Sequence, residues 1–289
     1  MKIISTLEAL QQERKQLAKE QKSIGYVATM GFLHEGHQSL MKRSKAENDI
    51  TVLSIFVNPL QFGEGEDFET YPRDAVRDLA VAEAEGVDIV FMPEAADMYP
   101  GSSTIKLHVA DRVDVLCGRS RPGHFDGVVT VLSKLFHLIQ PDRAYFGLKD
   151  AQQVAVVQAL VHDLNFPLEV VPVPTVREAD GLAKSSRNVY LSEEERQEAP
   201  AIHHALQQAK QSIQDGTKDP EKVASAVKEF INSQTSGRID YVEILSYPAL
   251  KPVREIDERI IIAAAVYFDK ARLIDNLVLE ADGSIMDRF

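Results

Sequence analysis

The sequence predicts an α/β protein with a Rossmann-like parallel sheet, covered by helices on both faces, and a smaller C-terminal α+β domain. Three observations predict this fold. The chain of 289 residues has the length of about two ordinary domains. Strand-like and helix-like segments alternate as far as residue 173, which is typical of a parallel sheet. Beyond Asn188 two helical stretches follow one another without a strand between them, so we predict domains at 1–180 and 181–289.

The elements of the first domain follow from hydrophobic periodicity. An amphipathic first helix is indicated by Leu7, Leu10 and Leu17 in a stretch rich in Glu, Gln and Lys. Buried strands are indicated by apolar runs at 24–29, 50–57, 88–93, 143–146 and 168–173. Helical patterns lie between these strands, at 39–48, 73–85, 128–139 and 151–164.

The second domain has a different rhythm. Two stretches rich in Glu, Gln, Lys and Ala, 193–214 and 220–232, predict consecutive helices. Three later segments, 240–245, 259–268 and 272–279, predict strands. Helices followed by strands favour a small α+β unit rather than a continuation of the parallel sheet.

The balance of charge argues against several classes of partner. The chain carries 32 Lys and Arg against 44 Asp and Glu, a net charge of −12. An acidic surface disfavours nonspecific binding to nucleic acids and anionic membranes, but permits a local basic pocket for a small anion. The one cysteine, Cys117, excludes an internal disulfide and a cysteine-based zinc cluster, which fits a reducing compartment. We find neither the apolar core of a secretory signal nor a run of about 20 apolar residues, so we expect a cytoplasmic protein.

The chemically most informative segment is VATMGFLHEGHQSL, residues 27–40. A strand ends there, a glycine-containing turn follows, and His34 and His37 open a helix. Backbone N–H groups at a helix N-terminus attract phosphate, Gly36 would let a base or ribose approach the backbone, and two imidazoles three residues apart share one face. Imidazole N–H groups can donate to phosphoryl oxygens. The alternative is a surface helix with two incidental histidines; a metal site is disfavoured because no third ligand lies at a zinc-like spacing.

A polar loop far along the chain offers a second group of anion ligands. In GLAKSSRN, residues 181–188, Lys184 and Arg187 could neutralise a triphosphate while Ser185 and Ser186 donate to its oxygens. The alternative is a plain interdomain linker. Its position at the edge of the second domain favours the functional interpretation, because such a loop can close over a nucleotide.

Two further strand ends carry polar side chains. Lys149 in FGLKDAQQ, residues 146–153, is a natural partner for a phosphate or carboxylate; alternatively it forms a solvated pair with Asp150 in an ordinary turn. Asn58 and Gln61 follow the strand at 50–57, where amides either cap a turn or bind a polar ligand.

Together these motifs closely resemble those of the pantothenate synthetase family, in the nucleotidyltransferase-like superfamily that shares an HxGH motif with class I aminoacyl-tRNA synthetases. The resemblance spans nearly the whole first domain in the family's order. Its carriers are TMGFLHEGH (29–37), FVNPLQF (56–62), YPRD (71–74), GRSRPGHFDGV (118–128), FGLKDAQQ (146–153) and GLAKSSRN (181–188). It implies a two-step reaction: pantoate and ATP give pantoyl adenylate and pyrophosphate, and β-alanine then attacks the acyl group to give pantothenate and AMP.

The resemblance also implies roles for individual residues. His37 would be a proton donor, His34 would lie beside the phosphates, and Lys149 would complete the catalytic set. Gln61 would contact pantoate and β-alanine, and Gln153 would contact pantoate. Asn58, Tyr71 and His124 would line the pocket. The ATP-binding residues would be Met30, Gly31, Phe32, Leu33, His34, Glu35, Gly36, His37, Gly147, Leu148, Lys149, Asp150, Val176, Lys184, Ser185, Ser186 and Arg187.

Elementary energetics supports neutral amides around pantoate. An arginine pair would stabilise the attacking carboxylate most in the ground state and so raise the barrier, whereas Gln61 and Gln153 avoid this penalty. Mg²⁺ is expected to accompany the triphosphate, without a metal site of the protein's own. The resemblance further implies a homodimer.

The sequence departs from the family's commonest pattern at two positions. Ala28 replaces a frequent proline, and Lys184 occupies a position that is often methionine, which predicts stronger phosphate neutralisation there. Two other functions remain open: another adenylyl-transferring enzyme of the superfamily, which would need extra cations for a phosphorylated acceptor, and a nucleotide-sensing protein without turnover.

Overall fold

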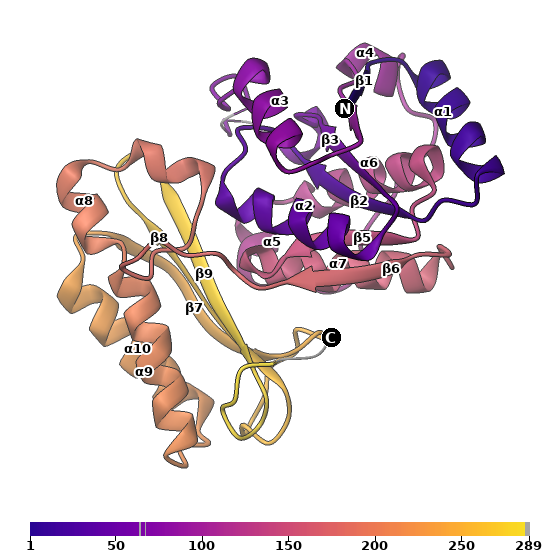
Figure 1. Cartoon of the computed structure of the whole chain (residues 1–289). Coiled ribbons are helices and arrows are strands. Elements are labelled where there is room, and N and C mark those ends of the chain that lie inside the picture. The colour runs from indigo at the N-terminus through magenta and orange to yellow at the C-terminus, as the bar shows by residue number, and fades with distance from the viewer. Residues whose placement is uncertain (64, 67, 287–289) are drawn as a thin grey trace. The chain divides into compact units, whose positions relative to one another are not determined.

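The computed structural model describes residues 1–63, 65–66 and 68–286, shown in Figure 1. Its contacts divide the chain into two compact units. The first unit comprises the described residues of Met1–Val113, Cys117–Gly147 and Val156–Val173, and the second comprises Asp114–Leu116, Leu148–Ala155 and the described residues from Pro174 onward. The chain therefore passes between the two units more than once. The single domain boundary between residues 180 and 181 stays a prediction.

The first unit contains a six-stranded sheet in which every paired strand is parallel, so the predicted fold class is confirmed (Figure 1). The strand order is β1-β4-β3-β2-β5-β6. The strands are β1 (Lys2–Ile4), β2 (Ile24–Thr29), β3 (Ile50–Ile55), β4 (Ile89–Phe91), β5 (Arg143–Gly147) and β6 (Glu169–Val173). The chain runs from β2 outward to β3 and β4 on one side, and later to β5 and β6 on the other. The reversal of strand order therefore lies between β2 and β5.

Helices flank this sheet, as predicted (Figure 1). The chain forms α1 (Leu7–Lys19), α2 (Glu35–Glu47), α3 (Ala75–Ala84), α4 (Ala95–Met98), α5 (Leu116–Ser120), α6 (His124–Ile139) and α7 (Ala151–Asp163). Short 3-10 helices lie at η1 (Pro59–Gln61) and η2 (Leu148–Asp150). Both α2 and α6 begin four residues before the apolar patterns at 39–48 and 128–139. Helical periodicity detects the buried face, and the first turns of these two helices are largely polar.

The apolar runs of the strands form the core of the first unit. Val27, Leu53, Val90 and Tyr145 come from four neighbouring strands and pack into one buried cluster. Strands buried on both faces cannot alternate polar and apolar residues, which is why these segments read as continuous apolar runs. The three-residue β1 was not predicted, because it is too short to carry a periodic signal.

The second unit contains an antiparallel sheet of order β7-β8-β9, which confirms the predicted α+β unit. Its strands are β7 (Arg238–Ser246), β8 (Ile260–Tyr267) and β9 (Arg272–Leu279), and its helices are α8 (Glu193–Glu198), α9 (Ala201–Gln214) and α10 (Pro220–Gln234). The prediction of one helical stretch over 193–214 was wrong, because the chain turns at Ala199 and Pro200. Proline has no backbone N–H to continue the helical ladder.

One close backbone approach fixes the segment after β3. A Cβ atom on Gly127 of α6 would lie 2.1 Å from the Leu60 carbonyl oxygen. The side chain of Asn58 spans the same contact, because its Nδ2 donates to the Gly127 carbonyl at 3.1 Å. Only glycine at position 127 allows η1 to rest directly on α6.

Replacing Gly127 with alanine tests this packing. Gly127→Ala should lower the free energy of unfolding by about 1–3 kcal/mol, because the added methyl group overpacks a backbone contact. The matched control is Gly147→Ala, where no heavy atom lies within 4 Å of the added Cβ. Urea denaturation of both variants measures the difference. Equal midpoints would contradict the packing described here.

Candidate active site

The turn after β2 is fixed by a buried carboxylate. Gly31 and Phe32 adopt left-handed backbone angles, with φ of 86° and 51°. Asp78 of α3 is 1% exposed, and its two oxygens accept hydrogen bonds from the Phe32 N–H at 2.8 Å and the Leu33 N–H at 2.7 Å. A Cβ on Gly31 would come within 2.9 Å of the same carboxylate. Asp78 therefore determines the path by which the chain reaches α2.

Asp78 was not predicted from the sequence, although a signal was present. It lies four residues before buried Ala82, so a charged side chain occupies the inward face of a helix. The neighbouring Arg77 supports the same turn: its guanidinium donates to the Leu33 carbonyl at 3.0 Å and lies 4.9 Å from the centre of the Phe32 ring. The Leu33 side chain is itself fully buried, so a ligand could meet only its backbone.

His34 and His37 lie together at the N-terminus of α2. His34 Nδ1 accepts from the Gly36 N–H at 3.1 Å, and His37 Nδ1 accepts from the His34 N–H at 3.2 Å. Since each Nδ1 is an acceptor, each neutral ring carries its proton on Nε2. The ring centres are 4.1 Å apart. A Cβ on Gly36 would lie 2.8 Å from the His34 ring, so this glycine makes room for the imidazole.

In the segment after β3, the side-chain amide of Asn58 holds that of Gln61. Asn58 is fully buried, and its Oδ1 caps η1 by accepting from the Leu60 N–H at 3.3 Å and from the Tyr99 hydroxyl at 2.8 Å. Burial raises the pKa of Tyr99, which keeps this hydroxyl a donor. Asn58 Nδ2 donates to Gln61 Oε1 at 2.9 Å. The capping interpretation of Asn58 is confirmed, and the cap also orients the Gln61 amide.

The backbone of Gln61 is held from the other side by α6 and the segment before it. His124 Nδ1 donates to the Gln61 carbonyl at 2.8 Å, and Arg121 donates to it at 3.3 Å. Arg121 also pairs with Glu66 at 2.6 Å. Burial tends to raise the pKa of Glu66, but the Arg121 hydrogen bond and charge outweigh it and lower the pKa. Tyr71 is buried, with its ring edge against Phe62. Sequence reasoning missed Arg121 and Glu66.

The sheet places these two segments next to each other. Thr29 at the end of β2 pairs with Ile55 at the end of β3, and β2 also pairs with β5, which ends at Gly147. In parallel strands all three ends lie on the carboxyl edge of the sheet. The turn between β2 and α2, which ends at His34 and is called the histidine turn below, therefore begins at a strand end next to the one from which the Asn58–Gln61 segment begins. Both lie beside the reversal of strand order.

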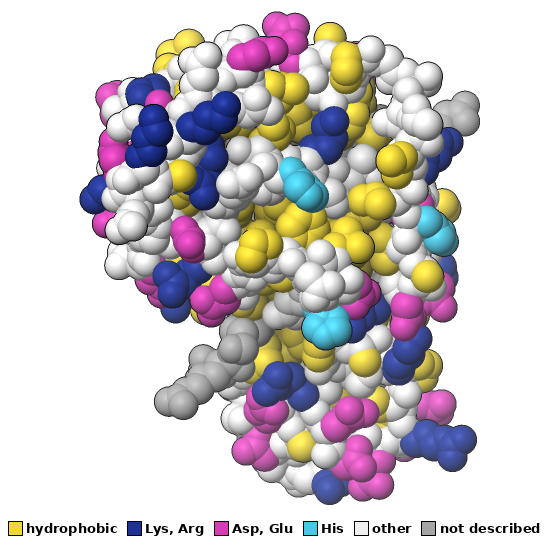
Figure 2. Space-filling view, turned by 90° about the vertical axis from the view of Figure 1, so that its right-hand side faces the viewer, with side chains coloured by type: hydrophobic (Ala, Val, Ile, Leu, Met, Phe, Trp, Pro, Cys, Tyr) yellow, Lys and Arg dark blue, Asp and Glu magenta, His cyan; other side chains and the backbone are white. Residues whose placement is uncertain are grey.

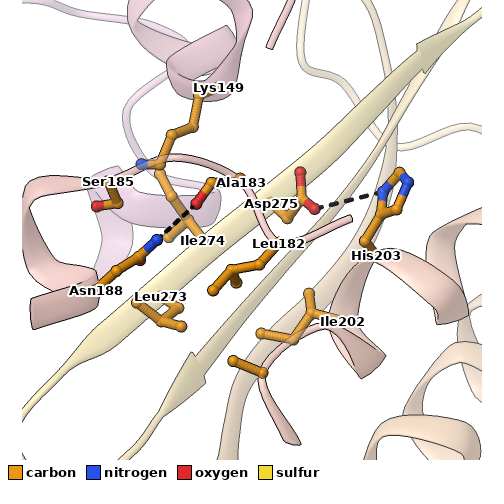
Figure 3. Close-up of a pocket in the computed structure, with 11 residues that line it drawn as sticks. Lys149, Leu182, Ala183, Ser185, Asn188, Ile202, His203, Leu273, Ile274 and Asp275 are labelled. Atoms are coloured by element: carbon orange, nitrogen blue, oxygen red, sulfur yellow. Dashed lines mark hydrogen bonds and ion pairs between the residues drawn. The ribbon is translucent and has the colours of Figure 1, made fainter. Parts of the chain in front are cut away.

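The second unit brings together Lys149 and Ser185, which were predicted from separate motifs. Both line a small cavity whose other polar walls are Asn188, His203 and Asp275 (Figure 3). Lys149 lies in η2, and half-buried Gln153 lies in the first turn of α7. Lys149 and Ser185 are therefore close neighbours within the second unit.

The loop containing Lys184 has the hydrogen bonds of a hairpin rather than those of an extended linker. The Lys184 N–H donates to the Val176 carbonyl at 2.9 Å, and Arg177 forms an antiparallel bridge with Ala183. Lys184 Nζ lies 3.1 Å from Glu178. Ser185 caps the 3-10 helix η3 (Ser186–Tyr190) by accepting from the Arg187 N–H at 3.3 Å. The two predicted cations thus stand on an ordered segment.

The described residues also bear on possible partners. No three His, Cys, Asp or Glu side chains in the described ranges gather as ligands for a metal ion. Within the same ranges, no helix combines the length and apolarity needed to cross a membrane. Figure 2 shows one face of the molecule, on which basic and acidic side chains are interspersed. The absence of a nucleic acid partner stays a prediction.

Doubly wound sheets bind nucleotides beyond the carboxyl ends of the strands where the strand order reverses. In this chain that edge carries a helix N-terminus with two imidazoles, which defines the class as nucleotide-binding α/β enzymes. The chain belongs to the pantoate-beta-alanine ligase family, whose model matches residues 2–278. The predicted resemblance and the prediction of a ligase are thereby confirmed.

Similar proteins extend over nearly the whole chain. The pantothenate synthetase of Bacillus subtilis (strain 168) is 59% identical over 280 residues, covering 97% of this chain and 98% of that protein. A crystal structure of pantothenate synthetase from Thermus thermophilus matches with a TM-score of 0.90 at 44% identity, covering 97% and 99% of the two chains. The pantoate-beta-alanine ligase of Francisella tularensis, described as complexed with beta-gamma ATP and beta-alanine, matches with a TM-score of 0.80 at 34% identity, covering 96% and 97%.

Replacing Asp78 with its isosteric amide tests the control of the histidine turn. Asp78→Asn presents an N–H₂ group to one of two backbone donors, which should lower the free energy of unfolding by about 1–3 kcal/mol. We also expect a higher KM for ATP, because the turn would lose its fixed path. Equilibrium unfolding and steady-state kinetics measure the two effects.

The matched control for this variant lies on the same helix. Asp74 caps α3 through the Arg77 N–H at 3.0 Å, and asparagine caps helices equally well, so Asp74→Asn should behave as the parent protein. An Asp78→Asn variant with the stability and KM of Asp74→Asn would show that the carboxylate does not control the turn.

Proposed function

We propose that this chain condenses pantoate with β-alanine in an ATP-dependent reaction that passes through pantoyl adenylate and releases AMP and pyrophosphate. The observation that carries this proposal is the histidine pair at the N-terminus of α2, beside the reversal of strand order, in a chain of the pantoate-beta-alanine ligase family. The Francisella tularensis relative complexed with beta-gamma ATP and beta-alanine supports two of the three substrates.

In the first step the pantoate carboxylate attacks the α-phosphorus of ATP. The nucleophile must be oriented without being neutralised, because a tight ion pair would stabilise the ground state and raise the barrier. A neutral amide meets this requirement. The Gln61 amide is held by Asn58 through Oε1, so its Nε2 is the group left to bind pantoate. Gln153 is assigned as a second neutral contact to pantoate.

Negative charge builds on the phosphoryl oxygens as the new bond forms. His34 and His37 each carry a neutral-form proton on Nε2, and His37 is assigned as the proton donor to the reacting phosphate. The N–H groups at the start of α2 add a favourable dipole. Lys149 of the second unit is assigned, with the two imidazoles, to the charge that develops at the reacting phosphorus. Lys184 and Arg187 of the same unit are assigned to the departing pyrophosphate, and Mg²⁺ enters with ATP as part of the substrate.

In the second step the amine of β-alanine attacks the acyl carbon. The bond from that carbon to the AMP oxygen breaks, and the amine loses a proton. Adenylate is a good leaving group, so the protein mainly has to hold the amine close to the carbon and exclude water. Gln61 is assigned to both acid substrates. A homodimer in the cytoplasm is part of the proposal, with the family resemblance as its support.

Pyrophosphate release separates this function from its alternatives. Purified protein with ATP should release pyrophosphate only when pantoate is present, and later addition of β-alanine should yield pantothenate and AMP. A superfamily enzyme that acts on a phosphorylated acceptor would release no pyrophosphate with pantoate. A nucleotide sensor would release none with any acceptor. Absence of pantoate-dependent release would refute the proposal.

Replacing His37 tests the phosphate contact. His37→Ala should slow adenylate formation by about a hundredfold or more, as loss of a preorganised donor does in other enzymes. The control is His137→Ala on α6, because His137 is exposed, donates to the Ser133 carbonyl of its own helix and packs its ring against Phe166. Rapid-quench measurement of pyrophosphate compares them. Equal rates would remove His37 from the reaction.

Lys184 has a specific test because the family often has methionine there. Lys184→Met should raise the KM for ATP about tenfold, the cost of one lost charge-assisted hydrogen bond. The control is Lys218→Met, which removes a lysine 3.8 Å from Glu255 in an exposed pair. Unchanged kinetics in Lys184→Met would dispose of the proposed contact with phosphate.

A further inference from the structure

Two adjacent residues of β9 contact both segments of the second unit that carry proposed phosphate ligands. We propose that Asp275 and Asn276 are positioning residues. They hold the turn that carries Lys149 (η2, Leu148–Asp150, the Lys149 turn) and the 177–187 loop in a fixed position relative to each other, so that both can bind ATP. This inference rests on the proposed function, because it takes Lys149, Lys184 and Arg187 as ligands of the ATP phosphates.

Asn276 holds the Lys149 turn. Its Nδ2 donates to the carbonyl oxygen of Leu148 at 3.0 Å and to that of Lys149 at 2.9 Å. Asn276 is only 8% exposed, so little water competes for these carbonyls. The two hydrogen bonds attach both residues of the turn to a single side-chain nitrogen. The backbone from which the Lys149 side chain projects is thereby fixed to β9.

Asp275 holds the loop through Arg177. The ion pair is bidentate, with guanidinium nitrogens 2.6 and 2.9 Å from the two carboxylate oxygens. Arg177 Nη1 also donates to the Gly181 carbonyl at 3.1 Å, across the hairpin turn. Bidentate pairs of this kind fix direction as well as distance. The base of the hairpin that carries Lys184 is therefore attached to the same strand as the Lys149 turn.

The geometry of a β-strand explains how the neighbouring residues Asp275 and Asn276 contact two different segments. Successive side chains on a strand point to opposite faces, so Asp275 and Asn276 project in opposite directions. The Asp275 carboxylate also accepts from the Asn276 N–H at 2.8 Å, which ties the two positions together. One rigid strand thus sets the relation between the turn and the loop.

The energetics of burial favours positioning over stability as the role of this pair. Asp275 is 5% exposed in a strand that is otherwise mainly apolar. A buried ion pair is generally no more stabilising than apolar residues of similar size. What it does supply is a directional contact to a defined partner.

The surroundings of Asp275 keep Arg177 as its principal cation. Nδ1 of His203 lies 3.7 Å from the carboxylate (Figure 3). Burial, followed by the charge of Arg177, lowers the pKa of His203 and so favours its neutral form. The His203 ring also packs against Gly181, where a Cβ would come within 2.7 Å of it. Lys149 and Ser185 line the same cavity, so the two held segments have a common wall.

The test compares three variants with a matched control in ATP kinetics. Asp275→Asn keeps the size and loses the charge, and Asn276→Leu keeps the size and loses the donor. Each should raise the KM for ATP about tenfold while the KM for β-alanine is unchanged, since a misplacement of about 1 Å can cost as much as a hundredfold and these changes leave the segments folded. Because both residues fix the same relative position of the turn and the loop, their effects should not multiply. The KM for ATP of the double variant should therefore rise by much less than a hundredfold.

The control is Asp240→Asn. Asp240 pairs with Arg272 of β9 at 2.7 Å, and the side chains of this pair are 20% and 17% exposed, so it is a second partly buried Asp–Arg pair on the same strand. It should lose comparable thermal stability and keep the parental KM for ATP. If Asp275→Asn fails to fold, Arg177→Lys tests the same contact, because it keeps the charge and loses the bidentate geometry; its KM for ATP should also rise.

The outcomes separate the two proposals. A parent protein that releases no pyrophosphate with pantoate would refute the proposed function before any variant is compared. With an active parent, variants that keep its KM for ATP would overturn the positioning role. Fully multiplicative effects in the double variant, or an equal rise in Asp240→Asn, would overturn it as well.

Discussion

The parallel pairing of β2 with β3 on one side and β5 on the other is the constraint on which the first unit depends. It brings the ends of three strands, distant in sequence, to one edge of one sheet. The histidine turn follows β2 and the Asn58–Gln61 segment follows β3, so their proximity needs no direct bond between them. The buried, continuous apolar strands fix this register, since a slip of a strand would break the packing of its neighbours.

Buried polar side chains then set the finer geometry by bonding to backbone. Asp78 uses both oxygens on the turn before α2, and Asn58 caps η1 while it orients Gln61. In the second unit Asn276 does the same for the Lys149 turn. None of these three groups has to touch substrate. Each of them uses a buried polar atom to hold a length of backbone in place. That backbone positions a neighbouring side chain, and the side chain itself is not neutralised by the contact.

The sequence predicted what local pattern determines. The strand at 24–29 was placed to the residue, and the helix at 151–164 to within one residue, because each has a long apolar pattern with clear ends. The predicted helix over 193–214 was wrong at Pro200, where periodicity persists across a turn that proline imposes. The HxGH turn and the amide pair were recognised from residue types at short spacing. Asp78, Arg121, Asp275 and Asn276 were not, because their partners lie 45 to 128 residues away and only the fold reveals them.

The central chemical claim is that the acid of pantoate bonds to the α-phosphorus before the amine arrives. Pantoate labelled with heavy oxygen in its carboxylate follows that bond directly, by mass spectrometry of the products. The account predicts that AMP formed in the complete reaction carries one labelled oxygen and that pyrophosphate carries none. Label in the released pyrophosphate, or AMP free of label while pantothenate accumulates, would contradict it.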